Sequence, residues 1–416
     1  MKKNIWIMNH YATNMFQEKA GRHYWFSKCL LEEGYKPTIF CASTIHNSDK
    51  QIKMSKAKFL TKIVDNIPFV FVKTTPYSGN GLKRIMNMIC FYKNLFSVTK
   101  KYAKRYGKPD VILASSVHPL TLVAGIKIAK KFGVQCICEV RDLWPESIVE
   151  YGNLKRNSII AKILYKGEKW IYEKADKLIF TMEGGKDYII NQKWDIEHHG
   201  LIDTKKVYHI NNGIDIELYD NNKKMNVIND EDLVDVQNFK VIYTGSIRHV
   251  NKVEKILDVA KILSNYNIKF LLWGAGDQVD ILKKRVEDEK INNVVFKGFV
   301  DKKYIPYITS NADLNIILGE NSFLFQYGGS LNKMFDYFAS GKPLLSTFTM
   351  GYSLIDSYKA GIELTDSSSV SIADNILYFA NLDEETYNDY CDNAHRAARD
   401  YDFRNLTLKL INIIEM

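Results

Sequence analysis

The sequence predicts two doubly wound α/β domains that join near residues 208–219. Its 416 residues exceed the usual size of a single hydrophobic core. Short apolar stretches alternate with helical stretches, a pattern typical of parallel sheets covered on both faces. This alternation pauses at Asn211, Asn212 and Gly213, which favour turns, and then starts again. The chain is therefore expected to contain two successive sheets.

The first series contains six expected strands and several amphipathic helices. The strands are IWIMNH (5–10), TIFCAS (38–43), FVFVKT (69–74), DVILASS (110–116), CICEV (136–140) and KLIFTM (177–182). The expected helices cover residues 20–33, 82–105 and 120–132, where apolar residues recur three and four positions apart. This series defines an N-terminal domain over residues 1–207.

The second series contains five expected strands. They are VIYTGS (241–246), FLLWGAG (270–276), VVFKGFV (294–300), LNIILGE (314–320) and PLLST (343–347). A helix is expected over 253–264 between the first two of these strands. The second domain is assigned to residues 208–395, and the C-terminal helical segment 396–416 is expected to return to the first domain.

Charge and composition narrow the possible partners. A net charge of +9 favours anionic partners, and between Gly79 and Pro109 the chain carries eight cations and no acidic residue. The expected helix there is either a solvated basic face or a surface that contacts an anionic membrane. The N-terminal apolar stretch is too short for a signal peptide or a membrane span, so a cytoplasmic location is expected. The six cysteines lack metal-type spacing and are expected to be reduced core thiols.

Three glycine-bearing segments of the second half follow expected strands or precede a helix. Ligands of open parallel sheets bind beyond the carboxyl ends of strands, where helix N-termini attract anions. In YTGSIRHVNK the strand ends at Gly245, and Arg248 and Lys252 follow. Cations at a helix start are unfavourable against the helix dipole, which favours a diphosphate-binding role over an ordinary surface position.

The second segment, LWGAGD, is a weak signal. Gly274 and Gly276 permit a tight turn near a nucleotide base, or a turn that is only structural. The first strand of the chain is followed by HYATNMFQEKAG, which lacks the GxGxxG fingerprint of dinucleotide-binding proteins. The sequence therefore argues against a nicotinamide-dependent dehydrogenase.

The third segment is QYGGSLNKMFDYFASGKPLLS, at residues 326–346. Gly328 and Gly329 allow a close approach of the backbone to a ligand, and Lys333 supplies a cation. Asp336 lies one helical turn after Lys333. Phosphate is expected to meet the N–H groups and the cation, and ribose hydroxyls the carboxylate; alternatively, Asp336 only favours the helix dipole.

Four stretches of the chain resemble a known family. They are LFQYGGSLNKMFDYFASGKP, EVRDLWPES (139–147), NNGID (211–215) and AGRHYWFSKCLLEEGY (20–35). Together they resemble the bacterial glycosyltransferase family 4 of the retaining GT-B superfamily, and specifically its capsule and O-antigen members. The resemblance implies two Rossmann-like domains that face each other across a cleft, with the acceptor on the N-terminal domain and the nucleotide sugar on the C-terminal one.

The resemblance also implies roles for individual residues. Asp336 stands at the second of two family glutamates eight positions apart, whereas Gly328 stands at the first and offers only its amide. Leu331 replaces a proline that is common among these relatives. His118 falls where a family histidine faces the donor sugar, although a core or capping histidine is the alternative. The expected catalytic residues are His118, Arg248 and Lys252. The expected donor-binding residues are Gly21, Gly245, Gly274, Gly328, Gly329, Ser330, Asn332, Lys333 and Asp336.

The acceptor side is expected at EVRDLWPES. Glu139, Arg141, Asp142 and Glu146 crowd four charges at a strand end, which is costly unless they pair or bind a ligand. Acceptor recognition is the preferred role, and a network from Arg141 to Asp142 or Glu146 that fixes the loop is the alternative. Glu183 ends a neighbouring strand and is a further candidate for a hydroxyl contact.

The resemblance implies a transferase that moves a sugar from a nucleoside-diphosphate sugar with retention of the anomeric configuration. Uridine diphosphate is the common nucleotide among these relatives, and an N-acetylated amino sugar is one candidate for the sugar. The implied acceptor is a polyprenyl-linked saccharide at the anionic inner face of the membrane, with no nucleic acid partner and no cofactor. No metal is expected either, because the chain offers no convincing DxD motif, and Arg248, Lys252 and Lys333 would take its place. A UDP-sugar 2-epimerase of the same architecture and a non-catalytic nucleotide-binding subunit are the alternatives.

Overall fold

The computed structural model describes residues 2–46, 51–54, 57–77, 79, 81–116, 118–152 and 154–416. The chain forms two compact units: unit 1 comprises Met1–Asn211 and Phe403–Met416, and unit 2 comprises Asn212–Asp402. The units meet four residues after the expected boundary at 207/208. The return to unit 1 begins at residue 403 rather than 396, because helix α16 (Glu384–Asp400) packs on other helices of unit 2.

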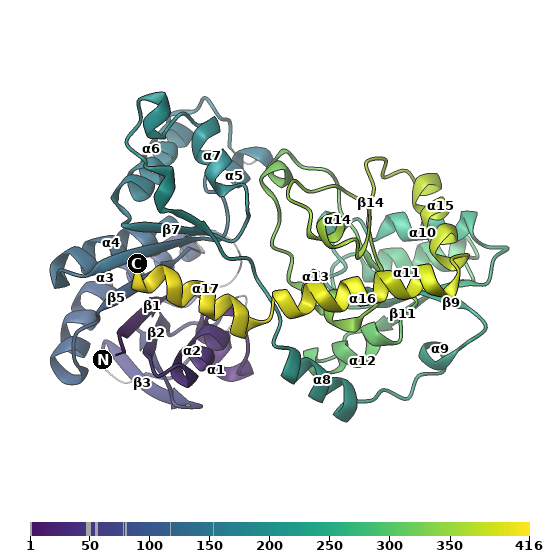
Figure 1. The fold of residues 1–416 in the computed structure, drawn as a ribbon, viewed down its shortest axis with the longest axis horizontal. Coiled ribbons are helices and arrows are strands. Elements are labelled where there is room, and N and C mark those ends of the chain that lie inside the picture. The colour runs from purple at the N-terminus through teal and green to yellow at the C-terminus, as the bar shows by residue number, and fades with distance from the viewer. Residues whose placement is uncertain are drawn as a thin grey trace. The chain divides into compact units, whose positions relative to one another are not determined.

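Unit 1 contains an eight-stranded sheet in the order β3-β4-β2-β1-β5-β6-β7-β8 (Figure 1). Only the pair β3 and β4 is antiparallel among the strand pairs that the structure describes. The strands are β1 (Asn4–Met8), β2 (Lys36–Ala42), β3 (Phe59–Val64), β4 (Ile67–Val72), β5 (Val111–Ser115), β6 (Gln135–Val140), β7 (Lys177–Phe180) and β8 (Val207–His209). The six expected strands are all present, and β3 and β8 are additions.

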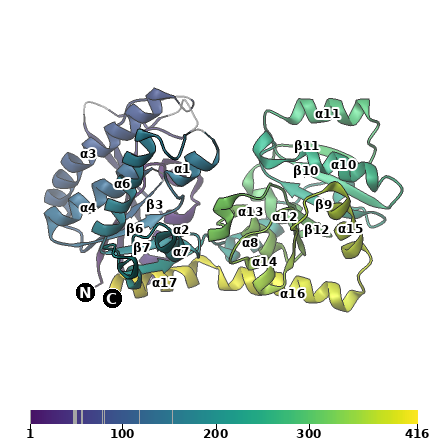
Figure 2. The same cartoon turned by 90° about the horizontal axis from the view of Figure 1, so that it is seen from above.

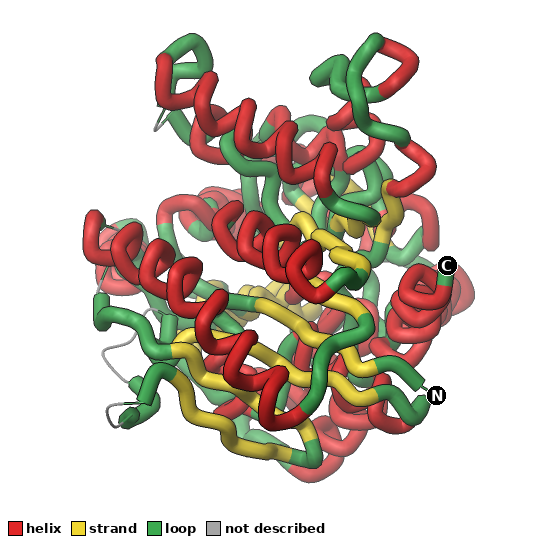
Figure 3. Tube along the Cα trace, turned by 90° about the vertical axis from the view of Figure 1, so that its left-hand side faces the viewer, coloured by secondary structure: helices red, strands yellow, loops and turns green. Residues whose placement is uncertain are grey.

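Helices lie across the strands of this sheet (Figure 3). They are α1 (Thr13–Glu18), α2 (Arg22–Glu32), α3 (Leu82–Tyr106), α4 (Pro119–Phe132), α5 (Glu146–Glu150), α6 (Ile159–Lys174), α7 (Gly185–Asn191) and α17 (Phe403–Glu415), with 3-10 turns η1 (Ile196–His198) and η2 (Thr204–Lys206). The C-terminal helix α17 packs against α2. The basic helix α3 forms as expected, and it buries Phe91, Leu95 and Val98 on one side.

Unit 2 contains a six-stranded parallel sheet in the order β11-β10-β9-β12-β13-β14 (Figure 2). The strands are β9 (Phe239–Thr244), β10 (Ile268–Trp273), β11 (Val294–Gly298), β12 (Leu314–Ile317), β13 (Leu344–Ser346) and β14 (Gly361–Glu363). Successive residues of β9 face opposite sides: Val241 and Tyr243 join one apolar cluster, whereas Ile242 joins another. The sheet therefore has a hydrophobic core on each face.

Helices precede, connect and follow the strands of unit 2. They are α8 (Ile216–Met225), α9 (Glu231–Val234), α10 (Glu254–Ile262), α11 (Val279–Asp288), α12 (Ile305–Ser310), α13 (Asn332–Ser340), α14 (Leu354–Tyr358), α15 (Ser369–Ala380) and α16, with η3 (His249–Asn251), η4 (Lys302–Tyr304) and η5 (Phe323–Tyr327). In the described part of the chain, no helix is both long and apolar enough to span a membrane.

The strand orders identify where a ligand would bind in each unit. In unit 1 the direction of strand addition reverses between β1 and β5, and in unit 2 it reverses between β9 and β12. The crevice outside the carboxyl ends of the strands at such a reversal is the usual ligand position in open α/β sheets. The segments that follow β1, β5, β9 and β12 are therefore the ones to inspect.

Candidate functional site

Lys333 places its ammonium group at the carboxyl end of β9. Its Nζ lies 4.2 Å from the centre of the Tyr243 ring. Gly245, which follows β9, has φ +146°, and a Cβ atom there would lie 2.7 Å from the same Nζ. Only glycine fits this position without a clash or backbone strain. The structure thus places two of the expected donor-binding residues side by side.

Burial shifts the pKa values of Lys333 and Asp336 toward neutrality. It lowers the pKa of Lys333 to about 8, although Asp336 partly offsets this effect. It raises the pKa of Asp336 to about 7, against the influence of Lys302 and Lys333. Both charges are therefore poorly solvated, and an anion bound at Lys333 would stabilise its ammonium form.

The helix that carries these residues is tied to β9. The Tyr337 hydroxyl accepts a hydrogen bond from the Thr244 N–H at 3.0 Å. Tyr337 is fully buried, so this contact fixes the register between α13 and the end of β9. The N-terminus of α13, whose first N–H groups have no intrahelical acceptors, is consequently held near the Gly245 loop.

Lys252 and Arg248 lie on the loop that follows Gly245. The Lys252 Nζ is 3.3 Å from Oε1 of Glu320, which follows β12. It is also 3.4 Å from Nε2 of His249. Arg248 is exposed. Of the three expected cations, Lys333 is packed against the strand end, Lys252 is ion-paired and Arg248 faces solvent.

The Gly328 segment differs from the expectation in one respect. The Gly328 N–H donates a hydrogen bond of 2.9 Å to the Phe325 carbonyl. This amide was expected to replace the missing glutamate, but it is already used inside its own loop. Gly329 packs closely on Met350, because a Cβ there would lie 2.5 Å from the Met350 Sδ.

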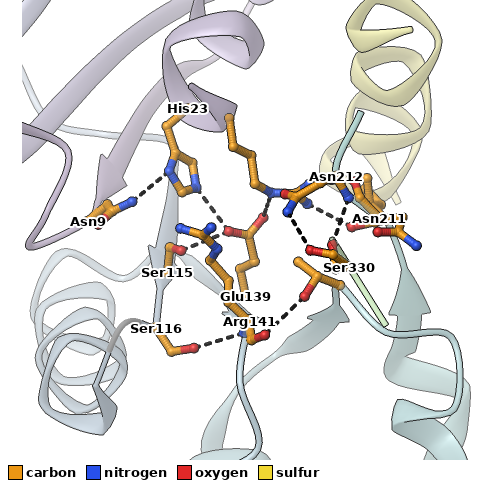
Figure 4. A network of polar contacts seen from close by, with 12 residues as sticks. Asn9, His23, Ser115, Ser116, Glu139, Arg141, Asn211, Asn212 and Ser330 are labelled. Atoms are coloured by element: carbon orange, nitrogen blue, oxygen red, sulfur yellow. Dashed lines mark hydrogen bonds and ion pairs between the residues drawn. The ribbon is translucent and has the colours of Figure 1, made fainter. Parts of the chain in front are cut away.

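Asn212 fixes the residues that begin α13. Its backbone N–H donates to the Ser330 Oγ at 3.2 Å, and its Nδ2 donates to the Asn332 Oδ1 at 2.9 Å (Figure 4). Ser330 and Asn332 were expected to bind the donor. In this structure they hold the NNGID segment, which explains why a polar asparagine pair precedes the second domain.

The backbone of the Gly245 loop packs directly against Gly274 and Gly276. A Cβ on Gly274 would lie 1.7 Å from the Gly245 carbonyl oxygen, and one on Gly276 would lie 2.0 Å from that of Ile247. Neither position tolerates a side chain. This packing fits the structural turn that was the alternative for Gly274, and the expected position beside a nucleotide base stays a prediction.

In unit 1, His118 contacts a second histidine that the sequence reasoning missed. His118 follows β5 and its Nε2 lies 2.6 Å from the Nδ1 of His10, which follows β1. Both rings are buried. Burial, together with Arg84, lowers the pKa of His118 to about 3, so the ring is neutral. Because β1 and β5 flank the reversal of strand order, His10 could have been identified from its place after the first strand.

Glu139 belongs to a buried ion pair and not to an exposed acceptor surface. Its Oε2 accepts from Arg22 Nε at 2.7 Å, and its Oε1 accepts from Ser115 Oγ at 2.8 Å and faces His23 Nε2 at 3.0 Å (Figure 4). Only 1% of Glu139 is exposed. Gly21, with φ +106°, directly precedes Arg22 at the start of α2. The expected acceptor role of Glu139 is therefore revised to an internal one.

The hydrogen bonds of Asn9 fix the protonation of this network. The Asn9 Oδ1 accepts from the Tyr11 N–H, so its Nδ2 donates to His23 Nδ1. His23 consequently carries its proton on Nε2, from which it donates to Glu139. Burial alone would raise the pKa of Glu139, but Arg22 and His23 hold it well below its usual value.

Glu146 is also used internally. Its Oε2 accepts from the Tyr165 hydroxyl at 2.7 Å, and its Oε1 pairs with Arg156. In the expected alternative, a network from Arg141 to Asp142 or Glu146, Glu146 thus has different partners, whereas Arg141 acts on Asp142 by lowering its pKa against the larger effect of burial.

The three remaining expected acceptor residues keep accessible side chains. Arg141 is partly exposed, and Asp142 and Glu183 are exposed. The Glu183 Oε2 lies 3.8 Å from His209 Nδ1. No group of three or more His, Cys, Asp or Glu side chains suited to a metal ion occurs among the residues that the structure describes.

Two family models match successive parts of the chain. The model "Glycosyltransferase Family 4" matches residues 24–218, and "Glycosyl transferases group 1" matches residues 225–397. A probable glycosyltransferase, WbjE of Pseudomonas aeruginosa, is 24% identical over 213 residues. That match spans half of this chain and half of the length of WbjE.

Solved structures share the whole fold. The sucrose-phosphate synthase of Thermosynechococcus elongatus has a TM-score of 0.70 at 16% identity and covers 100% of this chain and 98% of its own. Anabaena Alr3699/HepE, in complex with UDP and glucose, has a TM-score of 0.65 at 15% identity and covers 99% of both chains. The chain thus has the two-domain GT-B fold, and two glycosyltransferase family models match its two parts in turn.

Proposed function

We propose that this protein is a retaining glycosyltransferase that transfers a sugar from a nucleoside-diphosphate sugar to a saccharide linked to a polyprenyl diphosphate. The donor is a UDP-sugar, with an N-acetylated amino sugar as one candidate, and the pathway is capsule or O-antigen synthesis. The observation that carries the proposal is the contact between Lys333 and the Gly245 loop at the carboxyl end of β9.

The chemistry of transfer requires a cation at this position. Breaking the anomeric bond develops positive charge on the sugar and negative charge on the departing diphosphate. A desolvated ammonium interacts more strongly with this charge than a hydrated one does. Lys333 would meet the diphosphate together with the N-terminal N–H groups of α13, and Lys252 and Arg248 would meet it from the following loop.

Asp336 would accept hydrogen bonds from the ribose, and His118 would face the donor sugar from unit 1. The neutral ring of His118 suits a hydrogen bond to a hydroxyl group, because a neutral imidazole both donates and accepts. Arg141, Asp142 and Glu183 would contact the acceptor.

A panel of nucleoside diphosphates in a thermal-shift assay tests the donor class. UDP is expected to raise the unfolding temperature of the native protein by mass action more than the other nucleotides do. The shift is expected to be smaller at pH 9 than at pH 7, because Lys333 loses its proton as the pH rises through about 8. A UDP-induced shift that is the same at both values would remove Lys333 from the nucleotide site.

The acceptor dependence of UDP release separates the candidate reactions. A transferase releases UDP faster when a polyprenyl-linked saccharide is added. A 2-epimerase needs no such acceptor, and a non-catalytic subunit would bind UDP and release none with any acceptor. Either of the last two results would contradict the proposed transfer.

The proposed acceptor requires contact with a membrane, and α3 offers a surface for it. Its C-terminal half exposes Lys100, Lys101, Lys104 and Arg105, and its N-terminal turn exposes Leu82 and other apolar side chains. Such a combination is typical of helices that lie on anionic lipid surfaces.

Neutralising Lys100, Lys101, Lys104 and Arg105 to glutamine is expected to release the protein from anionic vesicles. Each cation near such a surface contributes about 1 kcal/mol at low salt. Co-sedimentation with phosphatidylglycerol vesicles measures the effect. The control neutralises four exposed lysines of unit 2, Lys223, Lys224, Lys283 and Lys284, and removes the same net charge. Equal loss in both variants would show that only the net charge matters.

A further inference from the structure

Glu320 brings a carboxylate to the reversal of strand order in unit 2. It follows β12 and its Oε1 lies 3.3 Å from the Nζ of Lys252. The Glu320 side chain remains 56% exposed, whereas that of Lys252 is 17% exposed. An ion pair with an exposed partner contributes little to stability, so the pair needs another reason for its position. The accessible carboxylate is available to a ligand.

The two neighbours of Glu320 are both anchored. Gly319 exchanges hydrogen bonds of 3.1 Å with Thr347: its N–H donates to the Thr347 Oγ1, which donates to its carbonyl. The Asn321 Oδ1 accepts from the Thr349 N–H at 3.0 Å. A Cβ on Gly319 would lie 2.7 Å from the Phe348 ring, so the chain is also tightly packed there.

These anchors hold the Glu320 backbone from both sides. Thr347 and Thr349 follow β13, the next strand of the sheet, so the segment is fixed to the sheet and not only to itself. A residue whose backbone is fixed before a ligand arrives loses less entropy on binding it. The backbone around Glu320 is fixed in this way, and its side chain, paired with Lys252, is accessible as a hydrogen-bond acceptor.

Gly328 offers a donor sugar no side-chain hydrogen-bond acceptor, and Glu320 would supply one. Gly328 has no side chain, and its N–H is bound to Phe325. The other carboxylate of this region, Asp336, is poorly solvated and has a pKa raised to about 7 by burial. Glu320 is thus the carboxylate that is both exposed and adjacent to a diphosphate-binding cation.

We propose that Glu320 accepts hydrogen bonds from hydroxyl groups of the donor sugar while its partner Lys252 binds the diphosphate. This assignment rests on the proposed function and extends it to a residue that determines donor specificity. The Lys252 ammonium has three N–H donors, so it can contact a phosphate oxygen and keep Glu320 in place.

The negative charge of Glu320 predicts which ligands the site should prefer. Next to a diphosphate, a carboxylate repels the added negative charge unless hydrogen-bond donors reach it. UDP has no sugar hydroxyl groups beyond its phosphates, whereas a UDP-sugar places several there. Glu320 should therefore disfavour UDP alone and favour the intact sugar nucleotide.

Isothermal titration of UDP, UDP-glucose and UDP-N-acetylglucosamine against wild type, Glu320→Gln and Glu320→Ala tests this. The wild type is expected to bind at least one of the two sugar nucleotides more tightly than UDP. Glu320→Ala should bind UDP at least as tightly as the wild type, and should reduce the advantage of the sugar nucleotide by roughly 10- to 100-fold. Glu320→Gln should show a smaller reduction, because its amide oxygen still accepts a hydrogen bond.

Glu289→Gln is the matched control. Glu289 also pairs with a lysine, Lys261, at 2.7 Å, but it follows α11. A helix that follows a parallel strand returns to the amino edge of the sheet, so Glu289 lies away from the carboxyl ends. This variant should bind all three ligands as the wild type does.

Two results would overturn the assignment. Equal changes in the affinities for UDP and for the sugar nucleotides would show that Glu320 acts only on Lys252. The same conclusion follows if neither sugar nucleotide binds the wild type more tightly than UDP does. Failure of the wild type to bind any of the three ligands would instead overturn the proposed function, and the assignment with it.

Discussion

Lys252→Ala and Lys333→Met are each expected to lower kcat/KM for sugar transfer by roughly 10²–10³, the scale for removal of one preorganised charge donor. Lys333 lies against Gly245 at the end of β9, and Lys252 lies on the loop that follows. Because both would face the same leaving diphosphate, the double variant should lose less free energy of activation than the sum of the single losses.

Lys255→Ala is the control for this pair. Lys255 lies in the first turn of α10, three residues after Lys252, but its Nζ contacts the Ser367 Oγ at 2.9 Å. Release of UDP from a UDP-sugar in the presence of a polyprenyl-linked saccharide measures all variants, and Lys255→Ala should stay within a few-fold of the wild type. An unchanged kcat/KM in Lys333→Met would remove the Gly245 loop from the diphosphate site.

Folding must be measured alongside activity. Burial lowers the pKa of Lys333, so the folded state disfavours its charged form at neutral pH. Methionine has a similar length and no charge, and Lys333→Met is therefore not expected to lower the unfolding temperature of the unliganded protein.

Sugar transfer is also expected to continue in the presence of a chelator. Loss of activity with chelator, restored by magnesium or manganese, would show that a metal ion neutralises the diphosphate.

The periodicity of the sequence was sufficient to predict the two sheets, because buried parallel strands read as short apolar runs. It missed β3, β8 and β14. The last two are three residues long, too short to show a period. β3 joins β4 through Asp65 and Asn66, both with positive φ, and this two-residue turn is a hairpin signal that the sequence does contain.

For the candidate site, too, some features could be predicted from the sequence and others could not. Segments that follow strands or begin helices could be identified from the periodicity of the sequence, and Gly245, Lys252 and Lys333 were predicted as site residues by that means. Partners could not, because they are distant in the sequence: Glu139 is separated from Arg22 by 117 residues. The sequence shows that four charges crowd EVRDLWPES, but it does not show which of them are neutralised internally.

Glu139→Ala is expected to destabilise unit 1 by roughly 3–5 kcal/mol, the cost of leaving a buried charge without its partner. The substitution removes the carboxylate that binds Arg22, His23 and Ser115. Arg22 would keep its bonds to the carbonyl groups of Ile210 and Asn211, which do not neutralise its charge. Urea unfolding measures the loss, analysed as two transitions because the units can unfold separately.

Glu183→Ala is the matched control, since Glu183 is an exposed carboxylate of the same unit and should cost less than about 0.5 kcal/mol. If Glu139→Ala were no more destabilising than Glu183→Ala, the internal role assigned to Glu139 would be contradicted. The low pKa of Glu139 adds a second signature. Its contribution should be complete above about pH 4.3, the value for an unfolded glutamate, and should decline as the pH falls toward the lower pKa of the folded state.

The double variant Arg22→Met, Glu139→Leu separates the charge from the rest of the network. Replacing both members of a buried ion pair by apolar residues is often neutral or stabilising, so much of the loss in Glu139→Ala should be recovered. Recovery should be incomplete, because the carbonyl groups of Ile210 and Asn211 lose the hydrogen bonds that Arg22 donates. Complete recovery would mean that Arg22 serves only to neutralise Glu139. Partial recovery would mean that Arg22 also stabilises the backbone of Ile210 and Asn211, the last residues of unit 1 before unit 2 begins.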